Sequence, residues 1–295
     1  MKQLNIVVPD GSMQEVVINL FAKAGLAITI EKKRTKRGRV GVPWIKEVVF
    51  QRPQEIPHYL NSGYFDLAIV GQDWIANWGY SFPILLKLPV GRNGKKPVRI
   101  VLAVKKESNL RKVEDFPIGC KVATEYVQLV QNFFSKKKRP DIIIIPSYGN
   151  TEQKIEFGVI AIVDVTESGE SLKENGLEII DEIMESNTVV VTNPESFADM
   201  DKKLLIDCFV RLIKGAYQAS KYVILTANVP TESLPEASKI IGGLKGPTIS
   251  RLAIDGWFAL QSVIKKEDEQ DVIFRLLQIN VTDIIVNREI PLIMS

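Results

Sequence analysis

The feature that most constrains the fold is a regular alternation of short apolar runs with amphipathic segments. Apolar runs of this length fit buried strands, and the segments between them repeat their apolar residues at helical spacing. The first set runs strand, helix, strand, helix, strand over residues 4–8, 13–24, 47–50, 56–62 and 67–70. This alternation predicts an α/β fold with parallel layers of strands and helices.

A second set of alternating elements begins near Arg99. It runs strand, helix, strand over residues 100–104, 129–134 and 159–165. Two sheets of modest size fit this division better than one very wide sheet. We therefore expect a second lobe with its own sheet.

The apolar run 188–192 indicates that the chain returns to the first lobe. Lobe I is then predicted to contain residues 1–98 and 187–220, and lobe II residues 99–186. Because open α/β units bind ligands at the carboxyl ends of their strands, a ligand cleft is expected between the lobes.

The last quarter of the chain follows the order strand, helix, strand, strand, helix, strand. Asp255 and Gly256 stand between two apolar runs, which is a strong hairpin signal. The order βαββαβ is that of the ferredoxin-like motif. We predict a separate domain over residues 221–295 that binds an effector or mediates assembly, although fold alone establishes neither role.

Charge and hydropathy narrow the classes of partner. The chain has 38 basic and 35 acidic residues and a net charge of +3, so its overall field is too weak to indicate nucleic acid. Its apolar runs fall far short of the roughly 20 residues that cross a bilayer. The first residues form a strand-like run rather than a signal peptide. We expect a cytoplasmic protein that binds neither nucleic acid nor membrane.

Cysteine and histidine are scarce. Cys120, Cys208 and His58 are the whole set, which argues against a disulfide framework or a Cys/His metal centre. For His58, a surface position on a helix is a simpler interpretation than catalysis. The sequence therefore identifies neither a metal ligand nor a catalytic residue.

The most informative stretch is 159–177, a buried strand followed by a hydroxyl-rich turn and a helix. Backbone N–H groups and the dipole at the start of that helix favour an anion, and Thr166, Ser168 and Ser171 offer hydroxyl donors. Gly169 would let the backbone approach a phosphate closely. An ordinary helix start capped by Ser168 or Ser171 explains the pattern at least as well.

Several further motifs accompany this turn along the chain. They are RPQEIPHYLNSGYFDLAIVGQDW (52–74), VATEY (122–126), SYGNTE (147–152), NVP (228–230) and GLKGPTISRLAIDGWFALQSV (243–263). Together with DVTESGESLKENGL (164–177) they resemble, in the family's own order, the ATP phosphoribosyltransferases. The resemblance covers nearly the whole chain, including the regulatory domain that only the long form of that family carries.

The resemblance implies a two-lobed body like that of periplasmic binding proteins, followed by the ferredoxin-like regulatory domain. It implies a glycosyltransferase that joins N1 of ATP to the ribose of phosphoribosyl pyrophosphate and releases pyrophosphate, the first step of histidine biosynthesis. The same resemblance implies Mg²⁺ as cofactor and histidine as allosteric effector. It also implies assembly into homo-oligomers, namely dimers and hexamers. Positioning and electrostatic stabilisation should dominate such a transfer, because charge develops on the departing pyrophosphate.

Two groups of site residues are carried over by motif. The group expected to hold the phosphate and ribose of the donor is Asp164, Thr166, Glu167, Ser168, Gly169, Glu170 and Ser171. The group expected on the nucleotide side is Asp10, Gly11, Ser12, Asp66, Gly71, Asp73, Arg99, Tyr126 and Glu152. The residues alone also allow a strand-end turn for Asp66, a helix cap for Asp73, a surface charge for Arg99 and packing for Tyr126.

The first turn departs from the family pattern. Family members carry Pro-Lys-Gly-Arg after the first strand, whereas this chain has Pro9-Asp10-Gly11-Ser12. An exchange of Lys for Asp within about 4 Å of a phosphate replaces attraction by a repulsion on the order of a few kcal/mol. Asp10 would still make a sound N-cap for the following helix.

A basic run offers one compensation for the missing cations, although a solvated loop explains it equally well. The run consists of Lys32, Lys33, Arg34, Lys36, Arg37 and Arg39. Two alternatives to the family's activity stay open on this evidence. One is a paralogue that acts on a different nucleotide-like acceptor or donor, and the other is a non-catalytic regulatory or sensor protein.

Overall fold

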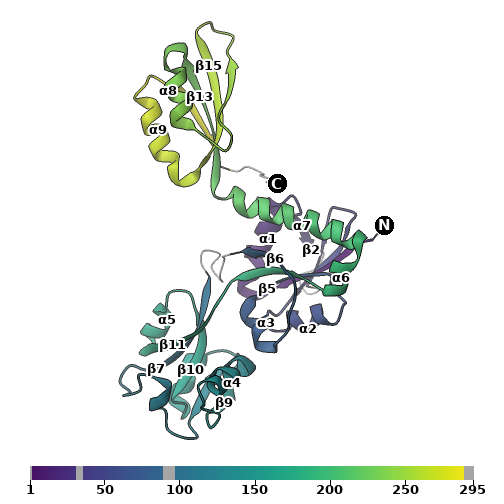
Figure 1. The fold of residues 1–295 in the computed structure, drawn as a ribbon, viewed down its shortest axis with the longest axis vertical. Coiled ribbons are helices and arrows are strands. Elements are labelled where there is room, and N and C mark those ends of the chain that lie inside the picture. Colours follow the sequence, from purple (N-terminus) through teal and green to yellow (C-terminus); the bar gives the residue numbers. More distant parts are fainter. Residues whose placement is uncertain (1, 31–35, 89–96, 289–295) are drawn as a thin grey trace. The chain divides into compact units, whose positions relative to one another are not determined.

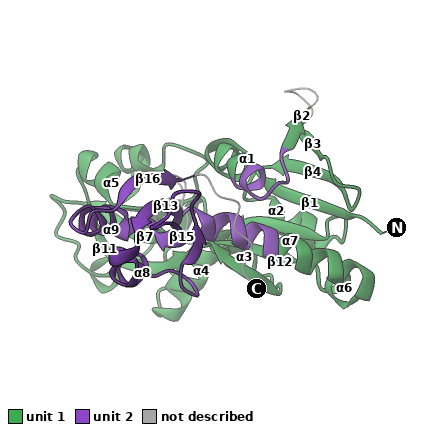
Figure 2. Ribbon diagram, turned by 90° about the horizontal axis from the view of Figure 1, so that it is seen from above, with its two compact units in different colours: residues 1–19, 28–210 green, residues 20–27, 211–295 purple. Residues whose placement is uncertain are grey.

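A computed structural model describes residues 2–30, 36–88 and 97–288 of the chain. These residues form three β-sheets with helices packed against them (Figure 1). They divide into two compact units, residues 1–19 with 28–210 and residues 20–27 with 211–295 (Figure 2). The boundary before the C-terminal part falls after residue 210, whereas the sequence predicted it after residue 220. The division of the chain into three domains stays a prediction.

The largest sheet belongs to the first unit and has the strand order β2-β3-β4-β1-β5-β12-β6. Its strands are β1 (Leu4–Pro9), β2 (Ile28–Ile30), β3 (Arg37–Val40), β4 (Ile45–Gln51), β5 (Leu67–Gly71), β6 (Ile84–Leu88) and β12 (Thr188–Thr192). β1 runs parallel to β4 and β5, whereas β12 runs antiparallel to β5 and β6. The sheet is therefore mixed rather than purely parallel, since β12 enters from the other lobe without a crossover helix.

Helices accompany this first sheet. They are α1 (Gln14–Lys23), α2 (Ile56–Asn61), α3 (Gln72–Trp78), α6 (Pro194–Ala198) and α7 (Met200–Ala219), with a 3₁₀ turn at Gly11–Met13 before α1. Local sequence sets their ends: the Asn193 side chain accepts from the backbone N–H groups of Glu195 and Ser196 at the start of α6. Gly79 ends α3 in the left-handed conformation. His58 is exposed on α2, as predicted.

The second sheet of this unit forms lobe II and has the strand order β11-β7-β10-β8-β9. Its strands are β7 (Val98–Lys105), β8 (Lys121–Thr124), β9 (Ile143–Pro146), β10 (Ala161–Thr166) and β11 (Leu177–Ser186). Its helices are α4 (Val127–Lys136) and α5 (Glu170–Glu174), with 3₁₀ turns at Val113–Asp115 and Thr151–Phe157. β11 leads through Asn187 directly into β12, so the chain crosses between the lobes at that residue.

The C-terminal segment has the predicted βαββαβ order. Its elements are β13 (Tyr222–Pro230), α8 (Leu234–Ile241), β14 (Thr248–Arg251), β15 (Trp257–Lys265), α9 (Glu269–Leu277) and β16 (Thr282–Asn287), with 3₁₀ turns at Thr231–Ser233 and Lys266–Asp268. The antiparallel sheet has the order β14-β15-β13-β16, and α8 and α9 cover one of its faces (Figure 1). Alternate residues of β13 are buried in one core with these helices. The ferredoxin-like prediction is confirmed.

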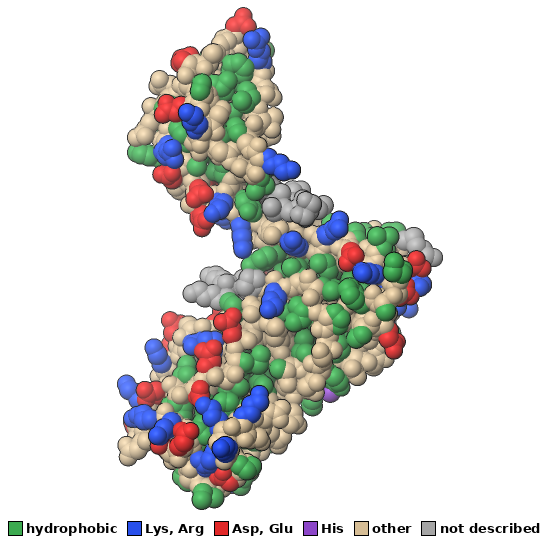
Figure 3. Space-filling model, in the orientation of Figure 1, with side chains coloured by type: hydrophobic (Ala, Val, Ile, Leu, Met, Phe, Trp, Pro, Cys, Tyr) green, Lys and Arg blue, Asp and Glu red, His purple; other side chains and the backbone are tan. Residues whose placement is uncertain are grey.

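The lengths of the helices and the distribution of surface charge agree with the apolar runs and the charge balance of the sequence. No helix in the described part of the chain combines the length and the apolar character needed to span a membrane. On the face drawn in Figure 3, basic and acidic side chains are interspersed rather than gathered in one patch. This face therefore presents no surface of a single charge.

Candidate active site

A cavity of about 490 Å³ lies where strands of both lobes end. From lobe I it is lined by Pro9 at the end of β1 and Gly71 at the end of β5. From lobe II it is lined by Glu125, which follows β8, and by Val165 near the end of β10. The predicted position at the carboxyl ends of strands fits this cavity.

Part of the predicted nucleotide side comes together around the cavity. The residues of that group that line it are Asp10, Gly11, Ser12, Gly71, Asp73 and Tyr126. These residues come from three motifs far apart in the sequence. Their convergence on one cavity supports the motif-based assignment.

Asp73 joins the two lobes beneath the cavity. Its carboxylate is buried and accepts hydrogen bonds from Ser186 Oγ at 2.6 Å and from Tyr126 Oη at 2.7 Å. Its backbone N–H donates to Ser186 Oγ at 3.0 Å. The alternative of a helix cap for Asp73 is wrong, because Gly71 is the N-cap of α3. Asp73 instead connects α3 of lobe I to two residues of lobe II.

Neighbouring contacts strengthen this junction. The rings of Trp74 and Tyr126 stack with centroids 4.5 Å apart, and Leu129 N–H donates to Asn77 Oδ1 at 3.1 Å. A Cβ atom on Gly71 would lie 2.1 Å from Asp73 Oδ1. Glycine is therefore required at this position as long as the Asp73 carboxylate keeps its place.

The turn after β1 brings a carboxylate to the cavity. Asp10 is the N-cap residue of the 3₁₀ turn that precedes α1, as predicted, but its side chain makes no capping hydrogen bond. The carboxylate instead forms an ion pair with the ammonium of Lys36. Of the remaining basic run, Arg37 pairs with Glu47 at 3.1 Å, whereas Lys32, Lys33 and Arg34 lie outside the described residues.

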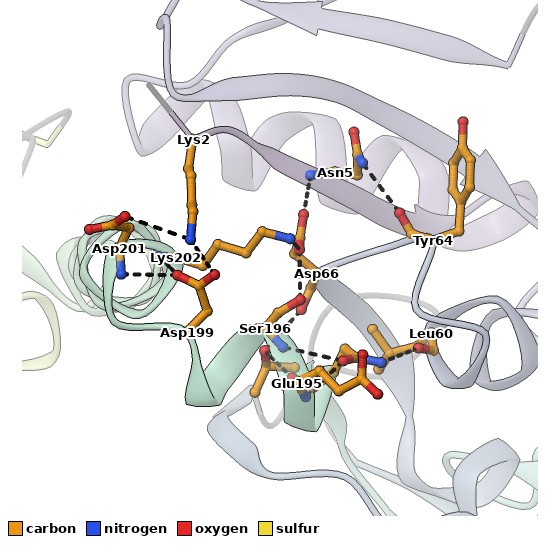
Figure 4. A network of polar contacts seen from close by, with 12 residues as sticks. Lys2, Asn5, Leu60, Tyr64, Asp66, Glu195, Ser196, Asp199, Asp201 and Lys202 are labelled. Carbon is orange, nitrogen blue, oxygen red and sulfur yellow. Dashed lines mark hydrogen bonds and ion pairs between the residues drawn. The ribbon is translucent and has the colours of Figure 1, made fainter.

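Asp66 is held in a structural network away from the cavity lining, and its assignment to the nucleotide side stays a prediction. It is 2% exposed and does not line the cavity. It accepts hydrogen bonds from Asn5 N–H at 2.7 Å, Ser196 Oγ at 2.7 Å and Lys202 Nζ at 2.6 Å (Figure 4). A carboxylate held by these donors links β1 and β5 to the start of α7.

Two further residues of the nucleotide group lie outside the cavity lining. Arg99 pairs with Glu182 at 3.3 Å on neighbouring strands of lobe II, which fits the surface charge considered for it. Glu152 accepts from Ser171 Oγ at 3.4 Å and thus contacts the predicted donor loop.

The predicted donor loop begins where the cavity lining ends. Val165 lines the cavity, and none of the seven predicted donor residues does. Because side chains alternate along a strand, Asp164 and Thr166 point to the opposite face of the sheet from Val165. Neither residue lines this cavity, and their assignment to the donor stays a prediction.

Hydroxyls of this loop are used within it. Thr166 Oγ1 accepts from Gly169 N–H at 2.8 Å, and Ser168 Oγ accepts from Glu170 N–H at 3.3 Å. Gly169 has φ of +82°, which favours glycine. Gly169 is the N-cap of α5 and no side chain makes a capping hydrogen bond there. Neither Ser168 nor Ser171 therefore caps the helix, and Ser168, Glu170 and Ser171 are exposed.

Several lining residues were missed at the sequence level. They include Arg52, Glu125, Tyr148, Ser186 and Thr188. Arg52 and Glu125 lie inside the motifs RPQEIP and VATEY. The motifs therefore pointed to the right segments, but the prediction named other residues within them. Ser186 and Thr188 flank the crossover at Asn187, and no sequence pattern marked that crossover as part of a site.

Comparisons with known proteins cover both parts of the chain. A family model described as ATP phosphoribosyltransferase matches residues 52–215, and a model for the HisG C-terminal domain matches residues 219–288. The ATP phosphoribosyltransferase of Pelotomaculum thermopropionicum is 35% identical over 283 residues, which cover 96% of each chain. That of Desulforudis audaxviator is 33% identical over 292 residues, covering 98% of this chain and 100% of that protein.

The similarity extends to a solved structure that is 28% identical in sequence. It is the ATP phosphoribosyl transferase (HisG:HisZ) complex from Thermotoga maritima. A chain of that complex superimposes with a TM-score of 0.63 at 28% identity, covering 73% of this chain and 99% of that one.

Proposed function

This chain belongs to the ATP phosphoribosyltransferase family, and from that membership we propose that its interlobe cavity carries out the family's reaction. N1 of ATP attacks the anomeric carbon of phosphoribosyl pyrophosphate, the bond from that carbon to the pyrophosphate oxygen breaks, and phosphoribosyl-ATP and pyrophosphate are released. This transfer is the first step of histidine biosynthesis. The convergence of Asp10, Gly71, Asp73 and Tyr126 on one cavity carries the proposal.

The cavity residues would act mainly by position and charge. The buried hydrogen bonds of Asp73 hold the wall against which a substrate would lie. Arg52 is a lining cation, and a guanidinium is well suited to the charge that develops on a departing pyrophosphate. The neighbouring donor loop, residues 166–171, is proposed to complete the site at the end of β10.

Mg²⁺ is proposed as the cofactor, carried by the substrates. No group of three or more His, Cys, Asp or Glu side chains that would hold an ion occurs among the residues described. Mg²⁺ commonly binds through substrate phosphates with one or two carboxylates, and Glu125 is a lining carboxylate in position to assist. When bound, the ion would neutralise phosphate charge.

The direct test is product formation by the purified protein. Incubation with ATP, phosphoribosyl pyrophosphate and Mg²⁺ should yield phosphoribosyl-ATP, detected by absorbance and mass spectrometry, and removal of Mg²⁺ with a chelator should stop it. Binding of both substrates without product would instead favour the sensor alternative. Product from another nucleotide alone would favour the paralogue.

Two arginines provide a matched pair of variants. Arg52→Met removes a lining cation and should lower kcat/KM about tenfold or more, since a hydrogen bond to a charged group contributes about 1.5–3 kcal/mol. Arg99→Met removes an arginine that pairs with Glu182 outside the lining and should leave kcat/KM within about threefold. Equal losses in both variants would count against the assigned cavity.

Histidine binding by the C-terminal domain, assembly into dimers or hexamers and a cytoplasmic location are proposed on the family membership. Gel filtration with light scattering tests the assembly.

A further inference from the structure

We propose that Lys36 is a substrate-binding residue whose ammonium rests on Asp10 in the free protein and contacts a substrate phosphate when the cavity is occupied. The inference rests on the proposed function, because it takes polyphosphate substrates as given. It selects one residue of the basic run that the sequence offered as a source of replacement cations.

The position of the pair suits this role. Asp10 lines the cavity, its side chain is 14% exposed, and its backbone N–H donates to Gln51 O at 2.8 Å. The carbonyl of Lys36 accepts from Phe50 N–H at 2.7 Å, while its side chain is 53% exposed. Both backbones are thus fixed to β4, and the half-exposed ammonium remains free to change its partner.

Charge around the cavity supplies the reason for such a change. Among the residues that the structure describes, the charged ones lining it are three carboxylates and one guanidinium, namely Asp10, Asp73, Glu125 and Arg52. Both proposed substrates carry polyphosphates, so a further cation close to this lining would stabilise them. Lys36 places an ammonium against a lining carboxylate.

A purely stabilising role explains the pair less well. Ion pairs with an exposed partner contribute little to stability, because water screens them and ordering a lysine costs entropy. Lys36 precedes β3 and has a left-handed backbone with φ of +48°. Its side chain pairs with Asp10, whereas that of Arg37, the first residue of β3, pairs with Glu47.

The test compares two substitutions that break the same ion pair. Lys36→Met should raise the KM for one substrate about 10- to 100-fold, the loss expected for a hydrogen bond to a charged group. Asp10→Asn should lower that KM or leave it unchanged, because Lys36 no longer has to leave a carboxylate. A stabilising pair predicts the same direction for both substitutions, so a parallel rise in KM overturns the proposal.

Controls separate this outcome from misfolding and from failure of the proposed function. Arg37→Met removes the neighbouring cation and should leave KM within about twofold, and Lys36→Arg should retain most of the affinity. Titration calorimetry with inorganic tripolyphosphate measures the contact without turnover, and Lys36→Met should weaken that binding. Unchanged tripolyphosphate affinity and unchanged KM in Lys36→Met would overturn the proposal even in an active enzyme.

The same kinetics identify the phosphate. ATP and phosphoribosyl pyrophosphate are varied separately at saturating partner. A rise confined to the KM for ATP assigns Lys36 to the triphosphate, and a rise confined to the KM for the donor assigns it to the donor's phosphates.

Discussion

Asp73 uses both oxygens of a buried carboxylate to hold the wall of the cavity. Its partners, Ser186 and Tyr126, come from two different segments of lobe II. Sequence motifs identified Asp73 and Tyr126 as site residues and missed their contact with each other, because a hydrogen bond between residues 53 positions apart leaves no local pattern. Ser186 left no signal at all for the same reason.

Removal of the Tyr126 hydroxyl tests this junction. Tyr126→Phe leaves one oxygen of a buried carboxylate without its donor, which should lower the free energy of unfolding by about 1–3 kcal/mol. Urea denaturation measures the difference. The matched control is Tyr148→Phe, whose ring is 84% exposed at the same cavity and which should change stability by less than about 0.5 kcal/mol. Equal effects would show that the junction contributes nothing particular.

An ion pair in lobe II should give the protein a defined acid sensitivity. Hydrogen bonds from the Arg139 guanidinium lower the pKa of Asp141 from 3.8 to about 2. Because the folded-state pKa lies below the unfolded value, the stabilisation is complete above about pH 4 and is lost as the pH falls toward 2. The Tm difference between wild type and Asp141→Asn should therefore shrink over this range. A difference that stays constant down to pH 2 would contradict the ion pair.

Among the elements, those with continuous apolar runs were predicted well and those with mixed composition were not. β1, β5 and β12 carry buried runs and agree with the expected ranges within a residue or two. β11 was missed, since LEIIDEIMES places acidic residues throughout a strand that is paired on one side only. The short strands β2, at the edge of the sheet, and β3, next to it, were missed because a basic run joins them.

The start of α7 depends on a buried carboxylate in the neighbouring sheet. Lys202→Met would remove one of the donors to the Asp66 carboxylate, which is 2% exposed. A broken buried pair costs about 3–5 kcal/mol, and partial exposure of Lys202 reduces that to about 2–4 kcal/mol. Chemical denaturation measures the loss. Lys2→Met breaks a surface pair with Asp199 at the same helix start and should leave the denaturation midpoint nearly unchanged, because water screens that pair. A similar cost for both would contradict the anchoring role of Asp66.

For the molecule as a whole, the C-terminal domain has a core of its own. The buried side chains of that core all lie between Val223 and Val281. Its order of elements was predictable because each strand and helix has a clear period and Asp255-Gly256 marks the hairpin. The position of its boundary was less predictable, since α7 continues without a break through the division at residue 210.

Truncation after Ser220 keeps α7 intact and removes this core. We expect the shortened protein to form phosphoribosyl-ATP and to lose inhibition by histidine, because the proposed effector site is gone. Initial rates with and without histidine measure both properties, with the full chain as control. Persistent inhibition would place the effector site in the body instead.

The crossover at Asn187 also limits how the enzyme can be recombined. One wall of its pocket depends on Asp73 in lobe I and on Ser186 and Tyr126 in lobe II. A chimaera that grafts either lobe from a relative inherits only half of this junction. Homologues can therefore exchange lobes freely only where both donors carry the same carboxylate, serine and tyrosine, and lineages that lose one member should change the others with it.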